Sequence, residues 1–225
     1  AHAMAMMYYE WKENKKIKNL SPRFLYALSK QEDGIPLQQG TFPRITAKIM
    51  SKAGCATETA IPNNTDLSHE DYIKIPMNEE ILADAKPYKV KGYASVPSDL
   101  NALNQAIFQN GVIPITISVG NFDNPIKKGA IGLHRVLATG YDGDKIFFRN
   151  SWDQWGDNGD GYINWADQEV TDIQAYVDLP NELILKAKKK YGLVWEDKPE
   201  LVVELCKEKL PVLLEDESKA IESSE

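Results

Sequence analysis

Cysteine is scarce in this sequence of 225 residues, in which Cys55 and Cys206 are the only two. They lie far apart and cannot form the set of disulfides that stabilises small secreted domains. Such scarcity is typical of a reducing compartment, such as the cytoplasm, or of a microbial lineage that dispenses with disulfides. The fold must therefore depend on a hydrophobic core, and a hydrophobic content of 43% is enough to form one.

Long apolar runs and clusters of basic residues are also missing. The stretch Val112–Val119 is among the longest apolar runs and is far too short to cross a bilayer, so we expect no membrane partner. The net charge is −7 and no basic residues are clustered, which argues against nucleic acid as a partner. The run Asp157–Gly161 lacks the spacing and the closing Glu of a calcium loop, so we interpret it as a turn. We expect no metal and no cofactor.

The order of the predicted elements favours an α+β fold, because helices precede an antiparallel sheet. Apolar residues at helical spacing, with capping residues at several ends, predict helices at 1–18, 21–28, 42–52, 78–85 and 98–111. A polar loop is expected at 62–69. Alternating or β-branched runs predict strands at 90–96, 112–119, 132–141, 145–150, 162–165 and 173–177. We therefore expect a helical lobe at 1–85 and a sheet lobe at 86–179.

The composition changes again after Pro180. Asn181–Tyr191 and Pro199–Leu210 have the pattern of amphipathic helices. Glu215–Glu225 is acidic and contains several serines, which is typical of a disordered tail. We expect residues 180–225 to form a helical, acidic extension of the two lobes.

The first predicted helix has no capping residue. Ala1, Met4, Met7, Tyr8 and Trp11 already follow helical spacing, whereas a helix of this length normally starts with Ser, Thr, Asp or Asn. We therefore expect further residues upstream of Ala1.

Three segments carry the most specific signal. Gly132–Tyr141 holds a histidine that opens a strand ending in Gly-Tyr, Phe148–Trp152 holds an Asn-Ser-Trp triplet, and Trp155–Tyr162 holds the pattern Trp-Gly, Asn-Gly, Gly-Tyr. Together they resemble the two C-terminal motifs of the papain family of cysteine peptidases. The resemblance covers roughly Ala1–Val177, and it implies a two-lobe fold with a peptide-binding cleft between the lobes.

The resemblance implies a catalytic role for His134 and Asn150. In the family, a thiol at the start of a helix attacks the peptide, and a histidine beside it favours the thiolate and imidazolium forms. His134 would act as base and then acid, and Asn150 would orient its ring without adding charge. Trp152 would shield the bond between them from water, which strengthens that bond.

The resemblance also implies where a peptide or protein substrate binds. Gly40 matches a glycine whose bare backbone pairs with an extended peptide, and Gly132 and Leu133 precede the histidine on the wall of the cleft. Leu133 stands where relatives often have a polar residue, and Arg135 stands where a small residue is usual. Both would alter the leaving-group side of the cleft.

The cysteine nucleophile and the glutamine of the oxyanion hole are absent from the sequence. Counting back from His134 and Asn150 by the family spacing places the thiol about two residues before Ala1. Cys55 follows a glycine that ends a helix, and Cys206 shares an apolar helix face with Leu205, so packing is the better interpretation of both.

Two hypotheses follow from this gap. The first is a truncated or processed chain of a peptidase that hydrolyses peptide bonds through a Cys-His-Asn site. The alternative is a pseudopeptidase, a module that keeps the cleft and binds peptides without hydrolysing them.

Overall fold

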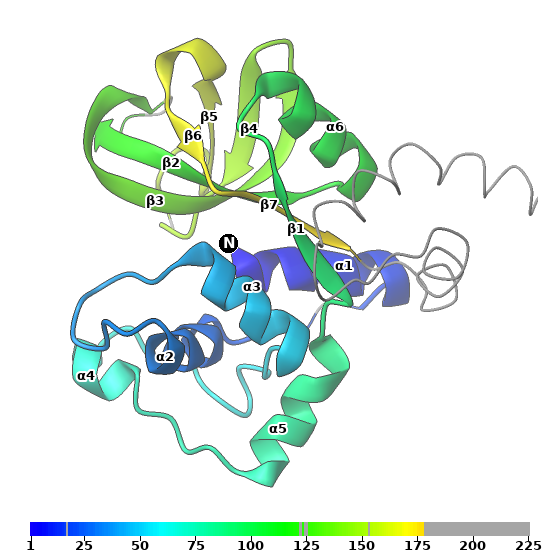
Figure 1. The fold of residues 1–225 in the computed structure, drawn as a ribbon, viewed down its shortest axis with the longest axis vertical. Helices are drawn as coiled ribbons and strands as arrows, with labels where there is room; N and C mark the ends of the chain where they lie inside the picture. The colour runs from blue at the N-terminus through cyan, green and yellow to red at the C-terminus, as the bar shows by residue number, and fades with distance from the viewer. Residues whose placement is uncertain (17, 122, 124–125, 153, 178–225) are drawn as a thin grey trace, which may run out of the picture. The chain divides into compact units, whose positions relative to one another are not determined.

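The structure, a computed structural model, describes residues 1–16, 18–121, 123, 126–152 and 154–177 (Figure 1). The chain divides into two compact units, Ala1–Tyr176 and Val177–Glu225. The first unit contains the candidate site. The predicted helices and acidic tail after residue 180 lie outside the described residues.

Helices dominate the first part of this unit. The α-helices are α1 (His2–Asn14), α2 (Pro22–Glu32), α3 (Pro43–Lys52), α4 (His69–Tyr72), α5 (Glu79–Ala85) and α6 (Leu100–Asn110), and the 3-10 helices are η1 (Lys86–Tyr88) and η2 (Trp165–Asp167). Helix α2 begins as its sequence predicts. The Ser21 side chain accepts a hydrogen bond from the Phe24 N–H, and Pro22 occupies a first-turn position that needs no N–H donor.

Two antiparallel sheets follow. The strands are β1 (Gly92–Val96), β2 (Ile113–Asn121), β3 (Lys127–Asp142), β4 (Lys145–Arg149), β5 (Asp160–Asn164), β6 (Val170–Thr171) and β7 (Ile173–Val177). The larger sheet has the order β5-β4-β3-β2-β6, and β1 pairs with β7 (Figure 1). In the β2–β3 register, Thr116 faces Arg135 and Ile117 faces His134. The predicted α+β class is confirmed, whereas the predicted boundaries at residues 85 and 179 stay predictions.

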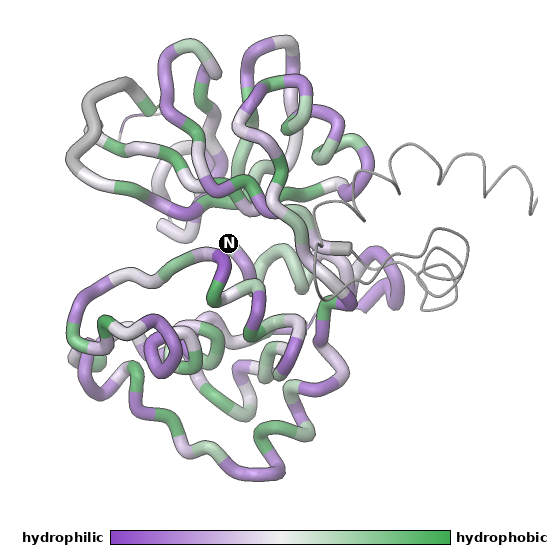
Figure 2. The backbone as a smooth tube through the Cα atoms, in the orientation of Figure 1, coloured by the Kyte–Doolittle hydropathy of each residue, from purple (hydrophilic) through white to green (hydrophobic). Residues whose placement is uncertain are grey.

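Two hydrophobic clusters stabilise the described residues. One joins α1, α2 and α3 and includes Phe24 and Met50, both with 0% exposure. The other lies between α6 and the larger sheet and includes Ile115 and Phe148. Hydrophobic and hydrophilic residues alternate along both strands and helices in Figure 2, as half-buried elements require.

Helix α1 packs between the other helices and the strands (Figure 1). Its Tyr9 hydroxyl donates to the carbonyl of Val112 at 3.1 Å, and the Tyr9 and Tyr176 rings meet edge to face at 6.5 Å between centroids. The His2 ring, which is 8% exposed, forms a hydrogen bond through Nδ1 with the Tyr176 hydroxyl. These contacts fix the start of α1 against β7.

A buried ion pair fixes the loop between α2 and α3. The Lys30 ammonium lies 2.8 Å from the Asp33 carboxylate, and it also donates to the carbonyl oxygens of Ile35 at 2.6 Å and Gly40 at 3.0 Å. Burial opposes the ionisation of Asp33, but hydrogen bonds from Lys30 and the Ile35 N–H outweigh it and hold the pKa of Asp33 below its ordinary value. The pair can be buried because the Lys30 ammonium meets the Asp33 carboxylate and two carbonyl oxygens, and the Asp33 Oδ1 accepts the Ile35 N–H.

Four details differ from the sequence predictions. Helix α1 ends at Asn14 rather than at residue 18, because Lys15 adopts a left-handed conformation with φ 54° and its N–H binds the carbonyl of Trp11. His69, predicted in a loop, is the first residue of the short helix α4. The helix predicted at 98–111 starts two residues later, at Leu100, and Asp99 caps it, since its carboxylate accepts from the Ala102 N–H at 2.8 Å. The two-residue strand β6 was not predicted.

Gly54 offers a test of this packing. Its φ is +91°, and an added Cβ would lie 2.1 Å from the carbonyl oxygen of Ala85, which ends α5. Gly54→Ala should therefore lower the free energy of unfolding by about 3 kcal/mol, through both strain and a backbone clash. The matched control is Gly34→Ala, because Gly34 has φ +73° with nothing within 4 Å of the added Cβ, and it should cost about 1 kcal/mol. Urea denaturation measures both, and equal losses would contradict this account.

Candidate active site

The β3–β4 hairpin brings His134 and Asn150 together. His134 lies within β3 and Asn150 directly follows β4, and the antiparallel pairing of the two strands returns the chain to the same end of the sheet. The His134 Nε2 and the Asn150 Oδ1 are 2.8 Å apart. Asn150 is 4% exposed, so the bond lies largely out of solvent.

The bonding of Asn150 determines the tautomer of His134. The Asn150 Oδ1 also accepts the backbone N–H of Ser151 at 2.7 Å, so the atom that faces both groups is the oxygen. A neutral imidazole has one N–H donor and one acceptor nitrogen. Because Nε2 faces an acceptor, Nε2 carries the proton and Nδ1 keeps its lone pair. Nδ1 is therefore the nitrogen of His134 that can take a proton from another group.

Trp152 covers one face of the His134 ring. The two rings stack at 4.3 Å between centroids with an interplanar angle of 22°. Trp152 meets Trp155 edge to face at 5.9 Å, and Trp155 stacks on the buried Phe148 at 5.7 Å. This row of aromatic rings anchors the His134 ring to the hydrophobic core of the sheet, which restricts its rotation.

Burial lowers the pKa of His134 from its ordinary value, and the hydrogen bond to Asn150 counteracts part of that shift. The α-amino group of Ala1 is close enough to lower the pKa of His134 as well. The imidazole is therefore mostly neutral at neutral pH, as a group that accepts a proton must be.

His134 lines a cavity of about 820 Å³. Its other walls come from the start of α1, from the loop before α3 and from the sheet: Ala1, His2, Gly40, Phe42, Thr116, Leu133, Arg135 and Asp172. The cavity thus joins segments that are far apart in the sequence. It places Ala1, which directly precedes α1, on the same cavity as His134.

The predicted substrate-binding residues are only partly brought together. Leu133 is 67% exposed and lines the cavity, whereas Gly132 precedes it on β3 and is not among the described residues that line it. Gly40 lines the cavity with φ +84°. Its N–H already donates to the Tyr26 hydroxyl at 3.0 Å, and its carbonyl accepts from Lys30. A peptide could reach only the second lone pair of that carbonyl without displacing Tyr26.

Sequence reasoning missed several residues of this cavity. The sequence assigns no role to His2, yet it lines the cavity and forms a hydrogen bond with Tyr176. Lys30 and Tyr26, which hold Gly40, belong to no recognisable motif. Arg135 alone stands out in the sequence, because it occupies a position where the family usually has a small residue.

The described cysteine lies outside this cavity. Cys55 is 0% exposed, and its thiol donates weakly to the carbonyls of Ser21 and Ala56 at 3.6 and 3.7 Å. Burial, with a further contribution from Asp84, raises the pKa of this thiol strongly. Packing is therefore the correct interpretation of Cys55, while Cys206 lies outside the described residues.

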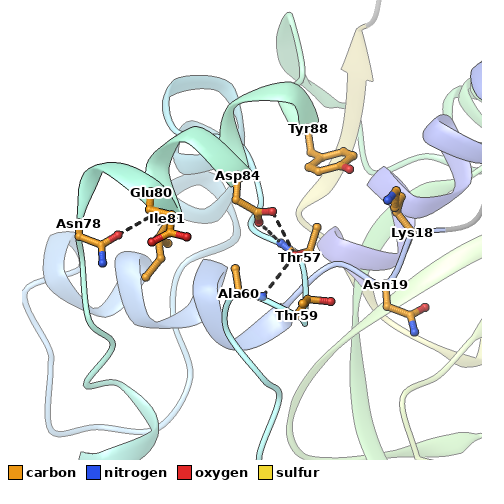
Figure 3. A pocket seen from close by; sticks show the side chains of 10 residues that line it. All are labelled: Lys18, Asn19, Thr57, Thr59, Ala60, Asn78, Glu80, Ile81, Asp84 and Tyr88. Atoms are coloured by element: carbon orange, nitrogen blue, oxygen red, sulfur yellow. Dashed lines mark hydrogen bonds between the residues drawn. The ribbon is translucent and has the colours of Figure 1, made fainter.

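A second cavity, of about 970 Å³, shares no described lining residue with the first (Figure 3). The Asp84 carboxylate, which points into the group shown in Figure 3, accepts the N–H of Thr57 at 2.7 Å and its hydroxyl at 3.2 Å. The Asn78 side chain accepts the N–H of Ile81 at 2.9 Å and so caps α5. These polar groups hold the loop and the helix in place, and we assign them a structural role.

In the part of the chain that the structure describes, no group of three or more His, Cys, Asp or Glu side chains could hold a metal ion. None of the helices in that part is long and apolar enough to span a membrane.

The bond between His134 and Asn150 can be tested by titration. Because this bond raises the pKa of His134, Asn150→Ala should lower that pKa further. The ring proton shifts in NMR spectra measure it, with His134→Gln used for assignment. The matched control is Asn164→Ala. Asn164, the last residue of β5, binds Asp167, so its loss should leave the His134 pKa unchanged. An unchanged or higher pKa in Asn150→Ala would show that the bond does not favour the imidazolium.

No family model and no curated protein matches the sequence. Solved structures do match. Xylellain, a cysteine protease from Xylella fastidiosa, has a TM-score of 0.70 and 21% identity over 80% of this chain and 78% of its own. The cysteine protease CMS1MS2 of Carica candamarcensis has a TM-score of 0.55 and 21% identity over 79% and 86%.

Digestive procathepsin L 3 from the larval midgut of Tenebrio molitor has a TM-score of 0.57 and 18% identity over 77% of this chain and 60% of its own. At such identities the likeness establishes the architecture and not the activity. The chain has helices followed by antiparallel strands, and its structure matches those of these proteases. The chain therefore has a papain-like α+β fold.

Proposed function

We propose that this chain forms most of a cysteine peptidase, in which His134 and Asn150 act with a thiol supplied by residues that precede Ala1. The observation that carries the proposal is the 2.8 Å bond from His134 to Asn150 at the edge of a cavity that Ala1 also lines. The bond leaves Nδ1 of His134 as the proton acceptor. The papain-like fold supports the proposal, since the matched structures of that fold are cysteine proteases.

The chemistry needs each of these groups. The thiol gives its proton to Nδ1 of His134, and the start of α1 favours the resulting thiolate. The sulfur attacks the peptide carbonyl carbon, and the imidazolium gives its proton to the leaving amine as the C–N bond breaks. Water then attacks the thioester, losing a proton to His134, and the carboxylic acid leaves as the thiol takes that proton back. Asn150 keeps the ring oriented through both half-reactions.

The position of Ala1 supports a thiol just upstream. Ala1 precedes α1 and its backbone carbonyl accepts from the Ala5 N–H at 2.9 Å, so the residues before it would continue from the helix start. The α-amino group of Ala1 is near enough to His134 to shift its pKa. A cysteine two residues before Ala1 would then lie at the positive end of the helix dipole and beside His134.

A pseudopeptidase is the second candidate. Among the residues that the structure describes, none places a reactive thiol in the cavity, since Cys55 is buried elsewhere. This observation favours the pseudopeptidase. Such a module would keep the cavity for binding a peptide and would not cleave it.

A pair of extended chains tests the proposal. Both carry Cys206→Ser and a designed segment upstream of Ala1 that contains a glutamine and ends in Gly-Xaa-Cys-Trp. The first, the Cys chain, keeps the cysteine of that segment. The second, the Ser chain, has serine in its place. The Cys chain should hydrolyse fluorogenic peptides, and intact mass should show stoichiometric labelling by E-64, the compound bound to the Carica candamarcensis protease. The Ser chain and the chain as it stands should remain unlabelled.

Further variants assign the roles. In the Cys chain, His134→Gln should slow labelling and hydrolysis by about 100-fold or more, as expected on removing a general base. Asn150→Ala should reduce the rate by a smaller factor, because it removes only the orienting group.

Labelling of the unextended chain in the cavity, dependent on His134, would contradict the need for an upstream thiol. A folded Cys chain that binds peptides without cleaving them would favour the pseudopeptidase.

A further inference from the structure

Arg135 places a guanidinium on the wall of the cavity, and no carboxylate of the described residues lies within 4.0 Å of it. It directly follows His134 on β3 and lines the cavity with Gly40, Phe42 and Leu133. Its recorded acceptors are neutral. Nη1 donates to the Thr116 hydroxyl at 2.9 Å and to the carbonyl of Asp172, and Nη2 donates to the Gln174 Oε1 at 3.0 Å.

The hydrogen-bonding capacity of Arg135 is only partly used. A guanidinium has five N–H donors, and these contacts occupy three of them. The Nε–H is buried without an acceptor, and one N–H of Nη2 has no recorded acceptor among the described residues. The residue as a whole is partly buried and lines the cavity.

Arg135 contributes a positive charge to the cavity. Burial lowers the pKa of Arg135 to about 10, so it stays charged at neutral pH. After burial, Arg135 makes the largest contribution to lowering the pKa of His2, which lines the same cavity. The Asp172 and Tyr176 side chains favour the charged form of Arg135, yet no carboxylate lies within ion-pair distance of it in the described part of the chain.

We propose that Arg135 binds a carboxylate of the peptide ligand in this cavity. A partly buried cation with neutral acceptors has lost hydration without gaining a counter-charge, and a ligand carboxylate would supply one. The Nη2 N–H that has no acceptor among the described residues can donate a charge-assisted hydrogen bond to one oxygen of that carboxylate. The carboxylate belongs either to a Glu or Asp side chain or to the C-terminus of the ligand. The inference deepens the proposed function, because it assumes that the cavity binds peptides.

Arg135 also has a structural role, which the experiment must separate from binding. Its bonds join β2 through Thr116, β3 through its own backbone, and the segment around β7 through Asp172 and Gln174. Losing those bonds would weaken the binding of charged and neutral peptides alike. A role in binding a carboxylate predicts a change in the ratio of their affinities.

Peptide binding to the chain as it stands tests the inference by isothermal titration calorimetry. One arm uses acetylated peptide amides on an alanine background, with Glu placed at each position in turn and Gln as its isosteric counterpart. The other arm compares the free acid and the amide of the same uncharged peptide. In at least one arm the carboxylate form should bind about 10-fold more tightly or better. That arm identifies the source of the carboxylate.

Variants complete the design. Arg135→Gln should abolish the preference, and Arg135→Lys should keep part of it, because a lysine retains the charge but not the planar donors. Lys145→Gln is the matched control: it removes a cation of the same lobe, which lies over the Tyr162 ring at 4.5 Å and does not line the cavity, so it should keep the preference. Thermal melting shows which variants remain folded.

Three results would overturn the inference: equal affinities in both arms, a preference that survives in folded Arg135→Gln, or no binding of any peptide in the set. None of these measurements involves cleavage. If the extended Cys chain fails to hydrolyse peptides while the carboxylate preference holds, the proposed peptidase activity fails and the inference about Arg135 stands.

Discussion

The packing of α1 against Tyr176 determines which groups face each other in the cavity. His2 and Tyr176 are 174 positions apart in the chain, and their bond joins the first turn of α1 to β7. Tyr9 adds a second anchor about two turns further along the same face of α1, through the carbonyl of Val112. Two anchors on one helix fix both its axis and its rotation. The start of α1 is therefore held on the cavity that His134 lines, and the candidate chemistry depends on that placement.

The cavity combines a fixed imidazole with walls that are themselves fixed by buried polar bonds. Asn150 sets the tautomer of His134, and Trp152 restricts the orientation of its ring. On the other wall, Lys30 and Tyr26 hold the backbone of Gly40. Buried polar groups that satisfy one another specify a single arrangement, because any other arrangement leaves a donor or acceptor unpaired. This explains how a site assembled from separate segments can be preorganised before a ligand binds.

The parts that the sequence predicts correctly are those with local causes. The Ser21–Pro22 cap, the helix ending before Gly54 and the β3–β4 hairpin each follow from residues within a few positions. The pairing of His134 with Asn150 was predicted from a motif, since composition alone cannot separate a candidate base from a structural histidine. Strand β6 was missed because two residues give no detectable alternation.

The remaining contacts depend on segments that meet only in the folded chain. Lys30 would be expected on the surface of an amphipathic helix, and its burial follows from the path of the loop that carries Asp33 and Gly40. The same applies to His2, which no spacing links to Tyr176. Such contacts decide how Gly40 and the start of α1 are presented, so the detailed shape of the cavity could not be derived from the sequence.

The electrostatics of the cavity follow from this assembly. Arg135 lowers the pKa of His2 because both lie on a cavity where burial weakens screening. A carboxylate bound at Arg135 would oppose that effect and raise the pKa of His2. By linkage, protonation of His2 would then strengthen the binding of the carboxylate to the same extent. Arg135 thus couples the charge of the ligand to the protonation of His2.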